Sequence, residues 1–412
     1  MTNRRTFIKT SSLAVAGVAL ASTMPMAACK GANEKLVCGA IGVNGMGWAD
    51  LAAFLKLPNT ECAAICDVDE SVLNKRIADT EKIQGKKPVG FKDYRKLLEM
   101  PGIDVVIIGT PDHWHCLPMV DACQAGKDVY CEKPLGNSIE EINVMEAAAN
   151  KYNTVVQVGM WQRSDPHWRE AVDFVKSGQL GKIRTVRTWA YQGWMEPVPV
   201  QPDGVAPAGV DYDFWLGPAP YKPYNVERVH ANFRGYWDYD GGGLGDMGQH
   251  YLDPVQYMLG KDETSPVKIE VDAPQQHYDA VGSWRRVTYT YADGCQIILD
   301  GENRDKDAAY IEGPNGKIYQ GFRSDIPNLK SFIETLPEPE PQITIFSDSV
   351  KSRKKFALNE MNGFRSATLV NLGIVAVRLG RTLHFDLDKL EFIDDEGANR
   401  LINQPMRAPW VI

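Results

Sequence analysis

The sequence lacks three features, and each absence excludes a class of protein. No apolar run can cross a membrane, because the run near the N-terminus extends only from Leu13 to Leu20 and a spanning helix needs about 20 such residues. None of the eight cysteines forms a CxxC pair, so the segment DHWHC at 112–116 has no second ligand pair at a recognised spacing. We therefore expect no metal site.

Basic charge is also scarce. The chain has 45 Lys and Arg residues against 53 Asp and Glu residues, a net charge of −8. Residues 1–28 hold three of the basic residues and no acidic one, which leaves 42 against 53, or −11, for the rest. A surface this acidic is unsuited to a phosphate backbone, so we exclude nucleic acid as a partner.

The remaining composition is ordinary for a soluble globular protein, with 44% hydrophobic and 24% charged residues. A length of 412 residues favours two or three domains. Such a chain can bury a large core without disulfides or structural metals.

Residues 1–28 resemble an export signal more than a folded element. A twin arginine, Arg4-Arg5, precedes the short apolar run, which resembles a twin-arginine (Tat) signal; a frayed N-terminal helix is the alternative. The letters MAAC at 26–29 resemble a lipobox in which Cys29 would carry the lipid. The pattern predicts an exported, periplasmic protein, with Cys29 as a candidate membrane anchor.

The region 35–160 alternates apolar strands with helices. This alternation predicts an α/β Rossmann domain with a doubly wound parallel sheet, in which ligands bind beyond the carboxyl ends of the strands. We expect strands at 36–42, 61–66, 88–91, 103–109, 128–131 and 154–158, and helices at 48–57, 117–125 and 138–150.

A glycine-rich turn, Gly42-Val43-Asn44-Gly45-Met46-Gly47, follows the first expected strand and leads into a helix. Glycines there let the backbone approach a pyrophosphate at the helix N-terminus. Asp67 follows the second strand, where a carboxylate can accept both ribose hydroxyls and repels a 2′-phosphate, so we expect NAD as the cofactor. An ordinary turn with a solvated aspartate is the alternative.

The region 161–412 has a different pattern, with strands expected at 183–190, 269–272, 285–291, 296–300 and 310–313 and few helices between them. We expect an α+β substrate and oligomerisation domain with an open, mainly antiparallel sheet. Residues 189–240 hold four of the ten tryptophans and six of the sixteen tyrosines. Such a segment is typical of a lid over a sugar, and a flap that caps the core is the alternative.

Four motifs stand out, namely the glycine turn, TPDHWH at 110–115, EKP at 132–134 and GGGLGDMGQH at 241–250. Together they resemble the glucose–fructose oxidoreductase/inositol dehydrogenase (Gfo/Idh/MocA) family, in an exported bacterial subgroup, and the similarity extends to VRLGR at 377–381 and to Trp410. The resemblance implies that Lys133, Asp246 and His250 form the catalytic group. The residues expected to bind the cofactor are Gly42, Asn44, Gly45, Met46, Gly47, Asp67, Thr110, Pro111, His115, Glu132, Lys133 and Gln162.

The same three catalytic residues suit alcohol oxidation on chemical grounds. Removal of a hydroxyl proton needs a base within hydrogen-bond reach, and His250 is the natural candidate. Asp246 lies four residues earlier, so on a helix it shares a face with His250 and can orient the imidazole. Lys133 can donate to the substrate oxygen.

Export constrains the redox cycle, because free NAD is absent outside the cytoplasm. We therefore expect a tightly bound cofactor that is regenerated in place. The resemblance implies oxidation of a secondary hydroxyl of a sugar or glycoside, with C3 and a 3-keto product as one outcome, in a homo-oligomer. A redox-neutral NAD-dependent glycoside hydrolase and a non-catalytic sugar-binding lipoprotein are the alternatives.

Overall fold

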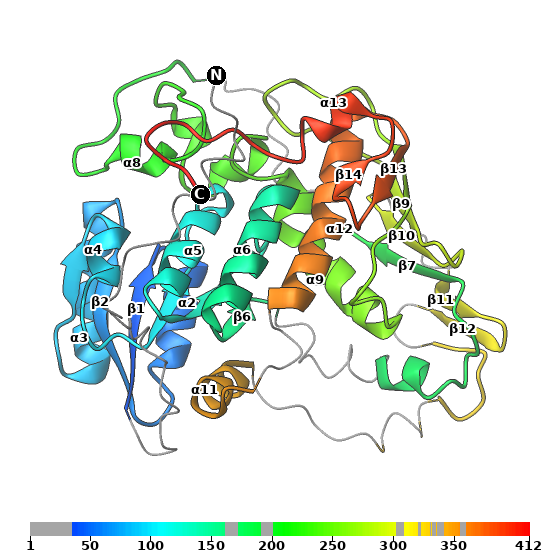
Figure 1. The fold of residues 1–412 in the computed structure, drawn as a ribbon, viewed down its shortest axis with the longest axis horizontal. Coiled ribbons are helices and arrows are strands. Elements are labelled where there is room, and N and C mark those ends of the chain that lie inside the picture. The colour runs from blue at the N-terminus through cyan, green and yellow to red at the C-terminus, as the bar shows by residue number, and fades with distance from the viewer. Residues whose placement is uncertain are drawn as a thin grey trace, which may run out of the picture.

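The computed structural model describes most of the chain after the N-terminal segment. Residues 1–34, with Cys29, and the segment 161–171, with Gln162, lie outside the described residues. Figure 1 shows a Rossmann domain (blue to cyan), a second domain built on a larger sheet, and helices packed between them. The described residues are 35–160, 172–190, 201–301, 309–319, 323–329, 331, 335, 342–354 and 360–412.

The first sheet has six strands in the order β3-β2-β1-β4-β5-β6, and every pair is parallel. Its central strands β4 and β5 are buried along their whole length and β1 at every residue but Val37, as expected where helices cover both faces. This confirms the predicted doubly wound sheet. The strands are β1 (Leu36–Ile41), β2 (Thr60–Cys66), β3 (Val89–Phe91), β4 (Val105–Ile108), β5 (Asp128–Cys131) and β6 (Val156–Val158).

Side chains cap the N-termini of several of the surrounding helices. Asp69 accepts a hydrogen bond from the Ser71 N–H (2.9 Å) and Ser138 accepts one from the Glu141 N–H (3.2 Å), which satisfies donors that a helix N-terminus leaves open. The helices are α2 (Met46–Phe54), α3 (Glu70–Gln84), α4 (Tyr94–Leu98), η1 (Asp112–Trp114), α5 (Cys116–Gln124) and α6 (Ile139–Tyr152).

The second sheet has eight strands in the order β12-β11-β7-β10-β9-β8-β13-β14. All of its pairs are antiparallel except β7 with β10, so the prediction of an open, mainly antiparallel sheet is confirmed. The strands are β7 (Thr185–Trp189), β8 (Lys268–Asp272), β9 (Arg286–Thr290), β10 (Gln296–Asp300), β11 (Ala309–Gly313), β12 (Gly316–Tyr319), β13 (Leu383–Asp386) and β14 (Glu391–Phe392).

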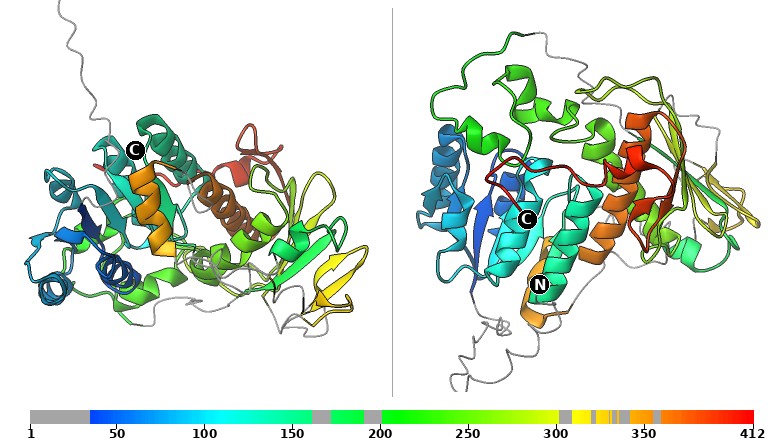
Figure 2. Two further views of the ribbon diagram at one scale, coloured as in Figure 1. Left: turned by 90° about the horizontal axis from the view of Figure 1, so that it is seen from below. Right: turned by 45° about the horizontal axis from the view of Figure 1, so that its top comes forward.

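Two helices from the C-terminal half of the chain pack against the Rossmann domain. Helix α12 (Glu360–Leu379) packs against α9 (Gly242–Met258) of its own domain and against α6 of the Rossmann domain. Helix α11 (Gln342–Ser352) lies beside the Rossmann sheet (Figure 2). The rings of Phe346 and Tyr130 are 5.8 Å apart. No helix in the described part of the chain is both long and apolar enough to cross a membrane.

The aromatic segment expected from the sequence folds over the Rossmann domain. It contains α8 (Tyr212–Leu216), η3 (Val226–Arg228) and η4 (His230–Gly235), and it buries a cluster of its own around Trp215, Tyr236 and Tyr239. Trp114 donates its Nε1 hydrogen to the Trp215 carbonyl (2.8 Å), which ties the segment to the loop after β4.

The C-terminal tail leaves α13 (Glu396–Asn399) and crosses back to the Rossmann domain (Figure 1, red). The ring of Trp410 meets Trp114 edge-on at 4.8 Å and Phe214 at 5.2 Å. Arg407 donates to the Gly217 carbonyl (3.0 Å) and pairs with Asp213 (2.6 Å). The tail therefore fixes the aromatic segment against the Rossmann domain.

We predict that Trp410→Ala lowers the free energy of unfolding by about 3 kcal/mol, because it opens a cavity in this aromatic cluster. Thermal denaturation measures the loss. Val411→Ala is the matched control, since Val411 is 78% exposed and should leave the melting temperature unchanged. Equal melting temperatures for the two variants would contradict the role assigned to the tail.

Candidate active site

A cavity of about 390 Å³ opens at the carboxyl edge of the Rossmann sheet, beneath the aromatic segment. Its wall combines the loops after β1, β2, β4 and β5 with residues of α8 and η4. This is the position at which ligands bind in parallel α/β sheets. The expected cofactor residues on the wall are Gly42, Asn44, Gly45, Met46, Asp67, Thr110, Pro111, Glu132 and Lys133.

The glycine turn brings open backbone N–H groups to this wall. Gly45 has φ +65° and ψ −122°, a conformation available to glycine, and nothing lies within 4 Å of where its Cβ would be. No side chain caps the N-terminus of α2, which follows. Its N–H groups and the helix dipole are thus left to an anionic ligand.

Gly47 serves the packing of the turn. A Cβ at Gly47 would lie 1.9 Å from the Gly42 carbonyl oxygen, and one at Gly109 would lie 2.4 Å from the Gly47 Cα. Helix α2 can therefore approach β1 and β4 only with glycine at this position. Gly47 supports the cofactor site from behind the wall.

Asp67 holds the same turn from the end of β2. Its Oδ2 accepts the Val43 N–H (3.0 Å) and its Oδ1 accepts the Asp69 N–H (3.0 Å). Burial raises the pKa of this carboxyl, and the two N–H groups oppose the shift. Each oxygen keeps a lone pair for a further donor.

These features fit NAD. The uncapped helix N-terminus and Gly45 suit a pyrophosphate, and the Asp67 carboxylate on the same wall suits a ribose diol. When bound, the nicotinamide supplies a carbon that accepts or returns a hydride. All the residues that would bind NAD in this way lie in the described part of the chain.

His115 lies behind the wall and braces two of its loops. Its Nδ1 is 2.7 Å from the Pro134 carbonyl and its Nε2 is 2.9 Å from the Thr110 carbonyl. Burial lowers the pKa of His115 to about 4, so the ring is neutral and donates to one of these carbonyls at a time. The residue links the loops after β4 and β5.

Lys133 lies on the cavity wall, and Asp246 pairs with it. The Lys133 ammonium donates to Oδ1 of Asp246 (2.8 Å) and to the Asp246 carbonyl (2.7 Å), and both side chains are nearly buried. Lys133 follows β5 and Asp246 lies in the first turns of α9, so this ion pair joins the two domains. Lys133 and Asp246 are 113 residues apart in the sequence.

His250 lies one turn beyond Asp246 on α9 and is 5% exposed. Burial, together with the charges of Lys133 and Arg234, lowers its pKa to about 3, while Asp246 opposes the shift. The imidazole is therefore neutral at physiological pH and able to accept a proton. Among the described residues that line the cavity, neither His250 nor Asp246 is included.

Arg234 is a cavity residue that the sequence did not reveal. Its Nη1 is 3.1 Å from Asp246 Oδ1, 3.0 Å from Asp240 Oδ2 and 3.6 Å from Asp112 Oδ1. Burial lowers the pKa of this guanidinium, but the three carboxylates together raise it above its ordinary value. A lone arginine in an irregular segment carries no spacing signal that could have found it.

A second pair of buried carboxyls lies behind Lys133. Asp50 on α2 and Glu132 after β5 are within hydrogen-bond reach of each other, and Tyr130 also reaches Asp50. Burial and the Glu132 charge raise the pKa of Asp50 to about 9, and burial raises that of Glu132. Asp50 is therefore protonated at physiological pH.

The histidines of TPDHWH point at backbone oxygens. His113 Nε2 lies 3.1 Å from the Trp215 carbonyl, and burial lowers the pKa of this ring to about 3. Within the described ranges, no group of His, Cys, Asp and Glu side chains is arranged to hold a metal ion. The motif instead shapes the wall of the cavity and supports the aromatic segment.

Comparison with protein families matches nearly the whole described chain. Residues 36–160 match the oxidoreductase family's NAD-binding Rossmann fold, and residues 174–412 match the C-terminal alpha/beta domain of the same Gfo/Idh/MocA family. The first match identifies the cofactor of the Rossmann domain as NAD. The second covers more than half of the chain.

Several curated relatives align with parts of the chain. Levoglucosan dehydrogenase of Pseudarthrobacter phenanthrenivorans is 27% identical over 235 residues, which are 55% of this chain and 52% of that protein. Alpha-N-acetylgalactosaminidase of Shewanella oneidensis is 31% identical over 160 residues, 34% of this chain and 35% of that protein. Oxidoreductase YrbE of Bacillus subtilis, of uncharacterized activity, is 24% identical over 270 residues, 65% and 67% of the two chains. The alignments thus span about a third to two thirds of these relatives.

Solved structures share the fold. The aldose-aldose oxidoreductase of Caulobacter crescentus, complexed with glycerol, superposes with a TM-score of 0.60 at 19% identity over 85% of this chain and 100% of its own. Levoglucosan dehydrogenase in complex with NADH and levoglucosan gives 0.59 at 19% identity, over 85% and 99%. At this identity the likeness concerns the fold.

We predict that Asp67→Ala weakens NAD binding at least tenfold and relaxes the preference for NAD over NADP, because it removes the ribose acceptor and the charge that repels a 2′-phosphate. Titration of both cofactors into stripped protein measures the change. Asp104→Ala is the matched control: Asp104 also accepts a backbone N–H, from Val37 (2.8 Å), but at the opposite edge of the sheet. Unchanged affinity and preference in Asp67→Ala would remove this residue from the cofactor site.

Proposed function

Because the chain belongs to the Gfo/Idh/MocA oxidoreductase family, we propose that it is an NAD-dependent oxidoreductase that oxidises a secondary hydroxyl of a sugar or glycoside. The C3 hydroxyl, with a 3-keto product, is the form of the reaction that we favour. The observation that carries the proposal is the Lys133–Asp246 pair, whose lysine lies on the wall of the same cavity as the glycine turn and Asp67.

The residues supply the proton chemistry of an alcohol oxidation. Lys133 donates hydrogen bonds from the cavity wall and can stabilise the charge that develops on the substrate oxygen. His250 is neutral, so it can accept the hydroxyl proton. A base with so low a pKa is weak, and it becomes effective only as loss of hydride acidifies the hydroxyl. Asp246 holds Lys133 in place.

A carbohydrate substrate agrees with the cavity and with the relatives. Phe214, Trp215 and Phe233 line the cavity opposite the glycine turn, and aromatic rings suit the apolar faces of sugars. The aligned levoglucosan dehydrogenase acts on a sugar derivative by its name. Both observations support a sugar or glycoside as the substrate of this chain.

A redox-neutral glycosidase is the second candidate. It is favoured by the 31% identity to an alpha-N-acetylgalactosaminidase over 160 residues. In such a reaction, oxidation at C3 acidifies the C2–H, elimination breaks the glycosidic bond at C1, water adds across the resulting C1–C2 double bond, and reduction restores the C3 alcohol. The same lysine and histidine would serve both reactions.

Location and assembly extend the proposal. Arg4-Arg5 and the apolar run support export by the Tat route, and Cys29 supports a lipid anchor on the periplasmic side. Tat carries folded proteins, so the cofactor would be loaded in the cytoplasm and retained. We also propose that the protein is a homo-oligomer.

We predict that NAD(H) copurifies with the folded protein, and that a panel of glycosides yields keto products when an artificial electron acceptor is present. Mass spectrometry of the released cofactor and of the products is the measurement. Net oxidation gives a product lighter by two hydrogens and needs the acceptor. Hydrolysis releases the aglycone without an acceptor.

The outcomes separate the alternatives. Release of the aglycone without a keto product would contradict net oxidation and support the glycosidase reaction. Sugar binding without any product would leave a non-catalytic binding protein. Protein that neither carries nor takes up nicotinamide would overturn both enzymatic readings.

We predict that His250→Ala and Lys133→Ala each lower kcat by roughly 10²–10⁴-fold, the usual effect of removing a positioned acid or base. Asp246→Asn should be milder, because the side-chain shape survives. The acidic limb of kcat/KM in the parent should lie well below 6.5, because the pKa of His250 is lowered to about 3. Steady-state kinetics across pH measures each effect.

Lys127→Ala is the matched control for Lys133. Lys127 precedes β5 and donates to the Ile103 carbonyl (2.8 Å) at the opposite sheet edge, so its loss should leave kcat unchanged. The double variant of Lys133 and His250 should lose little beyond the worse single one, since residues that act as a unit are not additive. Near-parental turnover in His250→Ala would show that the base lies elsewhere.

A further inference from the structure

Arg234 connects three carboxylates that come from separate parts of the chain. Asp112 follows β4 in the Rossmann domain, Asp240 precedes α9, and Asp246 lies within α9. The guanidinium in η4 contacts all three, at 3.6, 3.0 and 3.1 Å, and it lines the cavity beside Lys133. Asp112 and Asp240 are buried, so no solvent stabilises their charge.

Two cations share a single oxygen at the centre of this group. Oδ1 of Asp246 receives Lys133 Nζ at 2.8 Å and Arg234 Nη1 at 3.1 Å. The carboxylate is therefore held from two directions, and the position of the lysine ammonium depends on that of the guanidinium. Without Arg234, the three carboxylates would face each other with only Lys133 to compensate them.

We propose that Arg234 is a positioning residue of the active site, which keeps Asp246 directed at Lys133 and so holds the ammonium on the cavity wall. The inference rests on the proposed function wherever turnover is the readout. It assigns a required cation to the irregular segment before α9, outside the motifs that the sequence analysis selected.

The geometry needs an arginine. All three contacts are made by Nη1, which a guanidinium carries one bond farther from Cα than a lysine carries its ammonium. Lys at this position would keep the charge but not the three contacts. Arg234→Lys should therefore recover only part of the function that Arg234→Ala loses.

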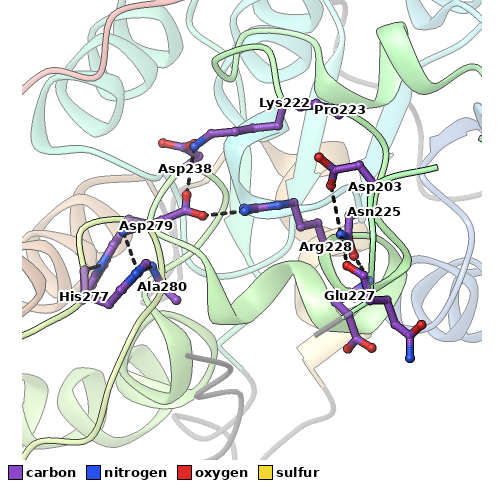
Figure 3. Close-up of polar contacts among 12 residues, drawn as sticks. Asp203, Lys222, Pro223, Asn225, Glu227, Arg228, Asp238, His277, Asp279 and Ala280 are labelled. Atoms are coloured by element: carbon purple, nitrogen blue, oxygen red, sulfur yellow. Dashed lines mark hydrogen bonds and ion pairs between the residues drawn. The ribbon is translucent and has the colours of Figure 1, made fainter. Parts of the chain in front are cut away.

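Arg228 provides a matched control in the same segment. It is buried and pairs with Asp279 at 2.5 Å, and Lys222 joins the same carboxylate at 3.0 Å (Figure 3). Its guanidinium also lies 4.4 Å from the centre of the Tyr236 ring. Arg228 is not among the described residues that line the cavity, so Arg228→Ala tests the loss of a buried ion pair without a change at the site.

The experiment compares Arg234→Ala, Arg234→Lys and Arg228→Ala as NAD-loaded proteins on a substrate of the parent. Arg234→Ala should lower kcat by roughly 10²-fold, the scale of a displaced catalytic group, with KM changed far less. Added guanidinium chloride should restore part of the activity of Arg234→Ala, and sodium chloride at equal ionic strength should not. Arg228→Ala should keep parental kcat and show no such rescue.

The pH profile gives a readout that a purely structural role would not move. The charged groups that act on His250 are Lys133, Arg234 and Asp246. Loss of the Arg234 charge removes one of the two cations that lower the pKa of His250, so the acidic limb of kcat/KM should move to higher pH. Arg228→Ala should leave the limb in place. Full turnover, no guanidinium rescue and an unmoved limb in Arg234→Ala would overturn the inference.

A double-mutant cycle measured by thermal denaturation tests the role of Arg234 without a substrate. Arg234→Gln should lower the melting temperature, because it leaves buried carboxylates without their cation. Asp246→Asn should then be less damaging in the Arg234→Gln background than in the parent, because the carboxylate that Arg234 contacts at 3.1 Å has already lost that partner. If no glycoside reacts, the proposed function fails while this cycle still tests Arg234. Additive losses would overturn the inference.

Discussion

The structure depends on compensating a group of carboxyls that are buried where the two domains meet. Two cations, Lys133 and Arg234, face Asp112, Asp240 and Asp246. Burial raises the pKa of Asp112 to about 6 and that of Asp240 well above its ordinary value, so part of the negative charge is removed by protons. An unpaired charge here would be strongly destabilising, which makes docking of α9 on the Rossmann edge a condition for folding as well as for chemistry.

The parts of the fold that follow from local patterns were predictable. Short stretches of sequence predict the buried strands, the helices between them and the glycines where α2 approaches β1. The Rossmann sheet follows from these local patterns. Gly47 illustrates the limit. The motif assigned it to the cofactor, whereas its contacts with Gly42 and Gly109 show that backbone packing alone already demands a glycine.

Long-range choices of partner were not predictable in the same way. The four-residue spacing of Asp246 and His250 places them on one face of α9, but it does not tell which neighbour takes the carboxylate. Oδ1 of Asp246 is engaged by Lys133 and Arg234, which arrive from β5 and from the aromatic segment. Only the three-dimensional fold brings these residues together. The neutral state of His250 likewise follows from its burial, which no spacing reveals.

The returning tail changes how the two domains can move. Two domains that are joined by a single connection can open about it as a hinge. Here the C-terminal tail also returns to the Rossmann domain, and Arg407 and Trp410 help to hold the segment that covers the cavity. Two points of attachment make a closed ring of contacts. The aromatic segment can therefore lift from the cavity only if its contacts with the tail break as well, so the tail restrains opening of the site.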